Sequence, residues 1–152
     1  MIPATVNRVP DHTADDVNEE IRRRTEANVI RVARGGDAAI ARRLEELDRE
    51  WDVERTLEAN AATAVLIGVT LGASVDKKFF FFPAVVAGFL LQHAVQGWCP
   101  PLPVFRRMGF RTQTEIEEER YALKAVRGDF RNKDGNPSGR FDASQALHAA
   151  QN

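Results

Sequence analysis

The single cysteine, Cys99, is the first candidate for chemistry in this chain of 152 residues. A cysteine reacts as its thiolate, so a role in accepting sulfur or sensing oxidants requires surroundings that stabilise the anion. Cys99 follows the end of a predicted helix, where the negative end of the helix dipole disfavours an anion. Arg106 and Arg107 reverse this effect only if the chain folds back toward the thiol. We therefore favour a structural cysteine and keep a reactive thiol as the alternative.

A second candidate site consists of polar residues inside two otherwise apolar runs: Asn60, Thr63, Gln92, His93 and Gln96. If the runs form an antiparallel helical hairpin, these side chains gather at one depth near its open end. Polar side chains at membrane depth face protein or water rather than lipid. We favour hydrogen bonds between the helices, each worth about 0.6–2 kcal/mol. The alternative is a binding or relay site in a small channel or transporter subunit, which requires oligomers because two spans cannot enclose a path.

Patterns typical of enzymes are missing from the sequence. It contains no Ser/His/Asp set, no phosphate-binding glycine loop and no dinucleotide fingerprint. A metal site would need more ligands than His93 and Cys99, and residues 132–135 do not continue into a calcium loop, because the glutamate that such a loop needs is absent. With 21 basic and 22 acidic residues, the balance argues against nucleic-acid binding by bulk charge. We expect no enzymatic activity, no metal and no cofactor.

The candidate polar residues and Cys99 lie in or next to two charge-free runs, residues 59–75 and 79–98. The elements that these runs form must position the candidate side chains. A helix needs about 17–25 mostly apolar residues to span a membrane. We therefore predict an all-α fold built on a two-helix transmembrane hairpin, with spans at about 57–75 and 79–98 and a tight turn at residues 76–78. A buried hairpin in a soluble bundle is the alternative. It is disfavoured because the runs lack a polar stripe and the flanks are too charged to cover them.

Basic residues next to the spans predict the orientation of the hairpin. Loops that stay in the cytoplasm carry an excess of lysine and arginine. The turn offers Lys77 and Lys78, and the two flanks offer Arg42, Arg43, Arg49, Arg55, Arg106, Arg107 and Arg111. Both termini are therefore expected in the cytoplasm. No signal peptide is expected, because the N-terminus lacks a basic start followed by an apolar stretch.

The N-terminal flank is expected to contain a disordered segment, residues 1–12, and then a charged helical arm, residues 13–50. The arm begins at a cap near Thr13 and is interrupted at Gly35. Its second helix, at about 38–51, carries an apolar stripe that ends in a tryptophan: Ile40, Leu44, Leu47 and Trp51. This pattern is typical of an interfacial helix lying on the membrane. A self-packing or coiled-coil segment is the alternative.

The C-terminal flank begins with three prolines, Pro100, Pro101 and Pro103, which we expect to end the second span and hold an extended exit. A capping box at residues 114–117 predicts the start of a charged helix, residues 113–128, that ends at Gly128. A flexible tail, residues 129–152, is expected to follow.

Small residues recur at four-residue spacing on both spans: Ala64, Gly68, Gly72, Ala84 and Gly88. Gly68 and Gly72 form a GxxxG pattern, which lets two helix backbones approach closely in lipid. One hypothesis is a homodimer through this face. The other is that the glycines pack the two spans of one chain against each other, and both can hold at once.

Residues 51–112 resemble the YgaP-like transmembrane domain, a bacterial inner-membrane domain of unknown function. The resemblance rests on the start at residues 52–55, the compact hairpin, the exit Gly97-Trp98-Cys99-Pro100, and Met108-Gly109. It implies an inner-membrane location, cytoplasmic ends and self-association. Some family members anchor a rhodanese sulfurtransferase domain. This chain has no such domain, since its only cysteine belongs to the exit.

From these features we predict a multi-pass protein of the bacterial inner membrane whose partners are the lipid bilayer, a second copy of the chain and a cytoplasmic protein. Its predicted role is that of a self-associating anchor or interaction module. The alternatives are a thiol-handling or redox-sensing protein that uses Cys99, and a small oligomeric channel or transporter subunit.

Overall fold

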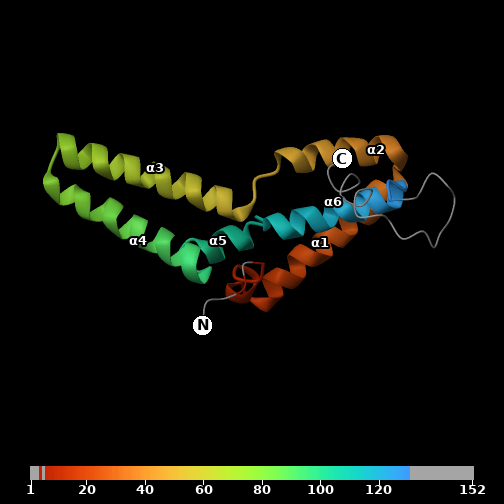
Figure 1. The fold of residues 1–152 in the computed structure, drawn as a ribbon, viewed down its shortest axis with the longest axis horizontal. Helices are drawn as coiled ribbons and strands as arrows, with labels where there is room; N and C mark the ends of the chain where they lie inside the picture. Colours follow the sequence, from red (N-terminus) through yellow and green to blue (C-terminus); the bar gives the residue numbers. More distant parts are fainter. Residues whose placement is uncertain (1–3, 5, 131–152) are drawn as a thin grey trace. The chain divides into compact units, whose positions relative to one another are not determined.

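The computed structural model describes residue 4 and residues 6–130, and these form helices with no strand (Figure 1). The all-α fold class is therefore confirmed for the part of the chain described. The helices, in chain order, are η1 (Pro10–His12), α1 (Asp15–Arg34), α2 (Gly36–Arg49), α3 (Val53–Ser74), η2 (Lys77–Phe80), α4 (Phe81–Gln96), α5 (Leu102–Arg107) and α6 (Gln113–Arg127). Residues 131–152 of the predicted tail lie outside the described residues, and they include the rejected calcium loop at 132–135.

The described chain divides into two compact units. The first combines the segment up to Arg24 with Glu50–Ile116, and so contains the helical hairpin. The second combines Thr25–Arg49 with the chain from Glu117 onward.

Helices α3 and α4 form the antiparallel hairpin that the two charge-free runs predict (Figure 1). The helix α3 begins at Val53, where the Asp52 carboxylate accepts a hydrogen bond from the Arg55 amide at 2.6 Å. At the turn, the Asp76 carboxylate accepts from the Lys78 amide at 2.8 Å and starts η2. A polar residue at each start thus supplies the acceptor that the first amides of a helix require.

Two helical stretches are long and apolar enough to cross a membrane by length and composition, Gly36–Ser74 and Lys77–Gln96. The apolar part of the first lies in α3, and that of the second lies in η2 and α4. The charge-free part of α3, residues 59–74, extends about 24 Å at 1.5 Å per residue, and the charged first turns of the helix add to its length at the base.

Glycines let α3 lie directly against the start of α4. A Cβ placed at Gly68 would lie 2.6 Å from the Pro83 Cδ atom, and one at Gly72 would lie 2.8 Å from a Phe80 ring carbon. Both distances are shorter than real carbon contacts, so a side chain at either position would displace Pro83 or Phe80. The GxxxG pattern therefore serves packing within one chain, as the second hypothesis for these residues predicts.

The base of the hairpin contains a small apolar core made of Val9, Val53, Leu57, Cys99 and Leu102. Phe105 and Phe110 pack against it, with their rings edge to face and 5.6 Å apart. The disorder predicted for residues 1–12 is wrong for the described part of this segment, because Val9 is 2% exposed and η1 follows it. An isolated valine in a polar segment has no periodic pattern that would announce its burial.

A buried arginine, Arg106, holds this base together. Its side chain is fully buried, yet all three of its nitrogens donate hydrogen bonds. Nε donates to the Thr13 hydroxyl at 3.1 Å, and Nη2 donates to the Asn18 amide oxygen at 3.0 Å. Nη1 donates to the Phe110 carbonyl at 3.0 Å, and both Nη atoms donate to the Glu115 carboxylate at 2.7 Å. One side chain thus joins the N-terminal segment, α5 and the start of α6.

The capping box of α6 lies two residues before the predicted one at residues 114–117. The Thr112 hydroxyl accepts from the Glu115 amide at 3.2 Å, and the Glu115 carboxylate accepts from the Thr112 amide at 2.7 Å. Residues 112–115 fit the same sequence pattern. The structure uses this box because Glu115 is also the carboxylate that pairs with Arg106.

The extended exit predicted after the second span is also wrong. The helix α4 ends at Gly97, whose φ of +84° is the left-handed conformation typical of a helix C-terminus. The chain then turns into α5, which Pro101 precedes and which has Pro103 in its first turn. Proline fits the first turn of a helix because no helical partner exists there for the N–H that it lacks.

The second unit buries the apolar stripe of α2 inside the protein. Ile40, Leu44 and Leu47 are at most 8% exposed, whereas an interfacial helix would leave them for lipid. This burial favours the alternative, a self-packing segment. The ordered helix also ends at Arg49, before Trp51. Within the same unit, Arg43 donates to both carboxylate oxygens of the fully buried Glu119, at 2.8 and 3.1 Å.

Removing the partner of Arg106 should destabilise the first unit strongly. We expect Glu115→Ala to lower the free energy of unfolding by about 3–5 kcal/mol, because it leaves a buried cation without its carboxylate. The control is Glu118→Ala, at an exposed position of the same helix, with an expected effect below about 0.5 kcal/mol. Urea unfolding followed by circular dichroism measures both. Equal losses in the two variants would contradict the role of the pair.

The same pair should weaken in acid. Burial alone would raise the pKa of Glu115, but hydrogen bonds from Arg106 and the Thr112 amide hold it below its ordinary value. The ionised carboxylate therefore stabilises the fold in full above the ordinary pKa of a glutamate, about 4.3. This stabilisation is lost as the pH falls through the lower pKa of the folded protein. Glu115→Gln should show a smaller loss over that interval.

Candidate functional site

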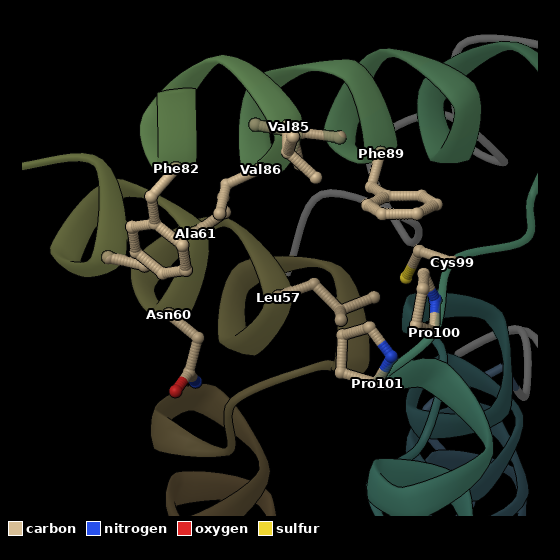
Figure 2. Close-up of a pocket in the computed structure, with 12 residues that line it drawn as sticks. Leu57, Asn60, Ala61, Phe82, Val85, Val86, Phe89, Cys99, Pro100 and Pro101 are labelled. Carbon is tan, nitrogen blue, oxygen red and sulfur yellow. The ribbon is translucent and has the colours of Figure 1, made fainter. Parts of the chain in front are cut away.

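An apolar groove of about 440 Å³ lies between α3 and α4 at the open end of the hairpin (Figure 2). On the α3 side, residues at helical spacing line it: Leu57, Asn60, Ala61 and Ala64. On the α4 side, the lining residues are Phe82, Val85, Val86, Phe89 and Leu90. The segment from Cys99 to Pro101 closes the groove at the base. The groove therefore joins the predicted cysteine to two of the predicted positions on α3.

Cys99 lies in the groove with its sulfur near Leu57 and the ring of Phe89 (Figure 2). The residue is 4% exposed, and burial raises the pKa of its thiol against the weaker opposing effect of a hydrogen bond from the Leu102 amide. The donors of Arg106, one of the arginines expected to support a thiolate, are engaged with other groups. These surroundings favour the neutral thiol and a structural role.

Asn60 and Thr63, the members of the predicted polar cluster on α3, donate hydrogen bonds within their own helix and not to α4. The Asn60 amide donates to the Thr56 carbonyl at 2.8 Å, and the Thr63 hydroxyl donates to the Ala59 carbonyl at 2.7 Å. Both partners belong to the same helix, α3. Side chains that bond to their own helix need no partner from a neighbouring one. On α4, Gln92 is half-buried and Gln96 is exposed, while His93 is buried.

His93 is the most enclosed member of that cluster, at 5% exposure. Neither of its ring nitrogens has a hydrogen-bond partner among the described residues. The charged and titratable groups that act on it are Arg8, His12, Glu54 and Glu58. His93 is therefore enclosed at the base of the hairpin, and it does not line the groove.

Arg8 links the N-terminal segment to the base of the hairpin, a role that the sequence does not predict. Its guanidinium forms an ion pair with Glu54 at the start of α3 and donates to the Ala94 carbonyl near the end of α4, at 3.1 Å. Its backbone lies against Gly97, where any Cβ would collide with the Arg8 carbonyl. Arg8 thereby links the bases of both hairpin helices. A lone arginine in a polar segment carries no signal of such a role.

The small residues divide between two faces of the hairpin. Gly68 and Gly72 are buried against η2 and the start of α4, and Ala64 lines the groove. On α4, Ala84 and Gly88 are exposed, and a Cβ placed at Gly88 would meet no atom within 4 Å. Only the α4 pair is therefore free to meet something outside the chain.

Acid–base and metal chemistry find little support in the described residues. Among them, no group of three or more histidine, cysteine or acidic side chains is arranged to hold a metal ion. A smaller cleft of about 150 Å³ lies beside α1 and α5, with Asp16, Glu20, Arg24 and Arg107 around it. Its acids and arginines form a mixed surface with no selectivity for one charge.

Comparisons with known proteins identify no relative: no family model matches the chain, and no curated protein or solved structure matches it significantly. The YgaP-like resemblance of residues 51–112 thus stays a prediction from the sequence. Function must be inferred from the surfaces and the groove described above.

Alkylation kinetics test the environment of Cys99. We expect N-ethylmaleimide to modify the folded protein at pH 7 more slowly than a free thiol with a pKa of about 8.5, because burial disfavours the thiolate and limits access. Unfolding in sodium dodecyl sulfate should restore rapid modification. A folded-state rate faster than that of the free thiol would restore the reactive-thiol hypothesis.

Proposed function

We propose that the protein is a non-enzymatic anchor of the bacterial inner membrane. In this proposal α3 and α4 cross the bilayer as a hairpin. The charged helices that flank them in sequence stay on the cytoplasmic side, where they meet a protein partner. The observation that carries the proposal is the large apolar surface of the hairpin, which the chain itself leaves uncovered.

That surface extends around both helices. Only 22% and 11% of the residues in the most apolar stretches of the two candidate spans are buried. The exposed large side chains include Leu66, Ile67, Val69, Phe81, Phe82, Leu91 and Val95, with exposures of 42–76%. Monomeric soluble proteins rarely expose a continuous apolar patch of more than a few hundred Å². A core hairpin of a soluble bundle would be covered, so lipid is the covering medium that fits.

The backbone and hydroxyl groups of the hairpin also suit lipid. In hydrocarbon every polar group needs an internal partner. The Thr70 hydroxyl donates to the Leu66 carbonyl at 2.8 Å, and the Ser74 hydroxyl donates to the Thr70 carbonyl at 2.6 Å. The exposed hydroxyls of α3 are thus satisfied within the helix. The charges of the hairpin region lie at its turn, Asp76, Lys77 and Lys78, and at its base.

Self-association is part of the proposal, and we assign it to the outward face of α4. The face of Gly68 and Gly72 is already occupied by the chain's own Pro83 and Phe80. Ala84 and Gly88 remain exposed, with open space beside Gly88. Small residues at four-residue spacing allow close helix contact in lipid.

The two alternative functions have weaker support. A thiol-handling role needs an accessible thiolate, whereas burial raises the pKa of Cys99. A channel or transporter subunit needs polar side chains that line a path. Asn60 and Thr63 instead bond to their own helix.

Membrane extraction tests the anchor. We expect the protein to stay in the pellet when membranes are washed with alkaline carbonate, because two lipid-covered spans cannot be released by removing charge contacts. Orientation can be measured in a Cys99→Ala background with an impermeant maleimide applied to cells with a permeable outer membrane. Lys77→Cys should react in such cells, and Arg42→Cys only after the inner membrane is broken. Release by carbonate would overturn the anchor proposal.

Crosslinking in native membranes tests self-association. We expect an amine-reactive crosslinker to give a dimer band that Gly88→Leu removes, because the leucine holds the two α4 backbones apart. The control is Ala62→Leu, which adds the same bulk at an exposed position of α3. A dimer band that survives Gly88→Leu would exclude this face.

A further inference from the structure

We propose that the groove between α3 and α4 binds one acyl chain of a membrane phospholipid. The inference rests on the proposed membrane location and names a ligand for a site that the anchor role alone does not require.

The groove opens onto the same apolar surface that faces lipid. Phe82, Val85 and Phe89 line its α4 wall, and each is also between 38% and 50% exposed. Figure 2 shows these side chains along one edge of the groove, with Leu57 and Ala61 across from them. The groove is therefore continuous with the lipid-facing surface of α4.

The chemistry of the walls selects hydrocarbon over a polar ligand. Asn60 is the one lining side chain with an amide, and its amide group already donates to the Thr56 carbonyl. The thiol of Cys99 is at most a weak hydrogen-bond donor. The second N–H and the oxygen of the Asn60 amide are the strong polar side-chain groups that the walls leave open. A ligand with several polar groups would therefore leave most of them without partners, a loss of about 1–3 kcal/mol for each group.

An unfilled groove at this depth would be unfavourable. In the hydrocarbon region no water is present to fill it, and the lining atoms would lose their dispersion contacts. The hydrocarbon that adjoins the hairpin in a bilayer belongs to phospholipids. We therefore commit to a phospholipid chain rather than a free fatty acid.

Photo-crosslinking in liposomes tests the proposal with the full chain. The probe is phosphatidylcholine that carries a diazirine on one acyl chain, and mass spectrometry locates the modified residues. We expect modification of Leu57 and Cys99, which are only 3% and 4% exposed but line the groove. We also expect modification of Leu66 and Phe81 on the outward faces.

Filling the groove gives the matched comparison. Ala61→Phe and Ala64→Phe should each abolish crosslinks to Leu57 and Cys99 while leaving those at Leu66 unchanged. Ala62→Phe, which adds the same ring at an exposed position, should leave all crosslinks unchanged. Groove crosslinks that persist in both filling variants would overturn the proposal.

The outcomes also separate this proposal from the anchor itself. Crosslinks on the outward residues without crosslinks in the groove of the unsubstituted chain would overturn the acyl-chain site alone. No crosslinks on the outward residues would overturn the membrane anchor.

A second experiment with a diazirine fatty acid decides the source of the bound chain. Groove crosslinks from the fatty acid but not from the phospholipid would overturn our assignment. Joining of Cys99 in two chains by a short bis-maleimide would show a second copy in the groove and would also overturn it.

Discussion

The fully buried guanidinium of Arg106 is the interaction on which the first unit depends. A buried cation is expensive unless it is paired and its donors are used, and Arg106 meets both conditions through Glu115 and three further acceptors. Those acceptors come from segments far apart in sequence, since Thr13 and Arg106 are 93 residues apart. The charge thus demands one arrangement of α5, the start of α6 and the N-terminal segment. The base that results positions the ends of α3 and α4.

With its base fixed, the hairpin needs no buried charge of its own. Its two helices meet near the turn through close contacts at glycine, as at Gly68 against Pro83. Toward the base the helices enclose space instead, and the apolar groove lies there. Close packing at one end and a groove at the other give the hairpin two different surfaces. The closely packed end stabilises the fold, and the groove is open to the surroundings.

The sequence predicted the features that depend on local rules. Charge-free runs predicted α3 and α4, and Gly128, expected to end α6, follows that helix in the left-handed conformation. The sequence predictions were wrong where a residue far along the chain decides between two local patterns that fit equally well. Two capping boxes were available at α6, and Arg106 selects the one that starts at Thr112. Likewise, no periodicity marks Val9 or Arg8, whose partners are far along the chain. The groove was not predictable, because it depends on the distance between two helices.

The contact between Arg8 and the end of α4 has a consequence for the order of assembly during synthesis. The Arg8 side chain reaches the Ala94 carbonyl across 86 residues, and its backbone lies against Gly97. During translation the N-terminal segment therefore leaves the ribosome long before its partners exist, whereas α3 and α4 are adjacent in the chain and can pair at once. The hairpin can therefore pair before the contact of the N-terminal segment with α4 is possible. A chain truncated before residue 94 would lack this contact, although Glu54, the partner of Arg8 on α3, would be present.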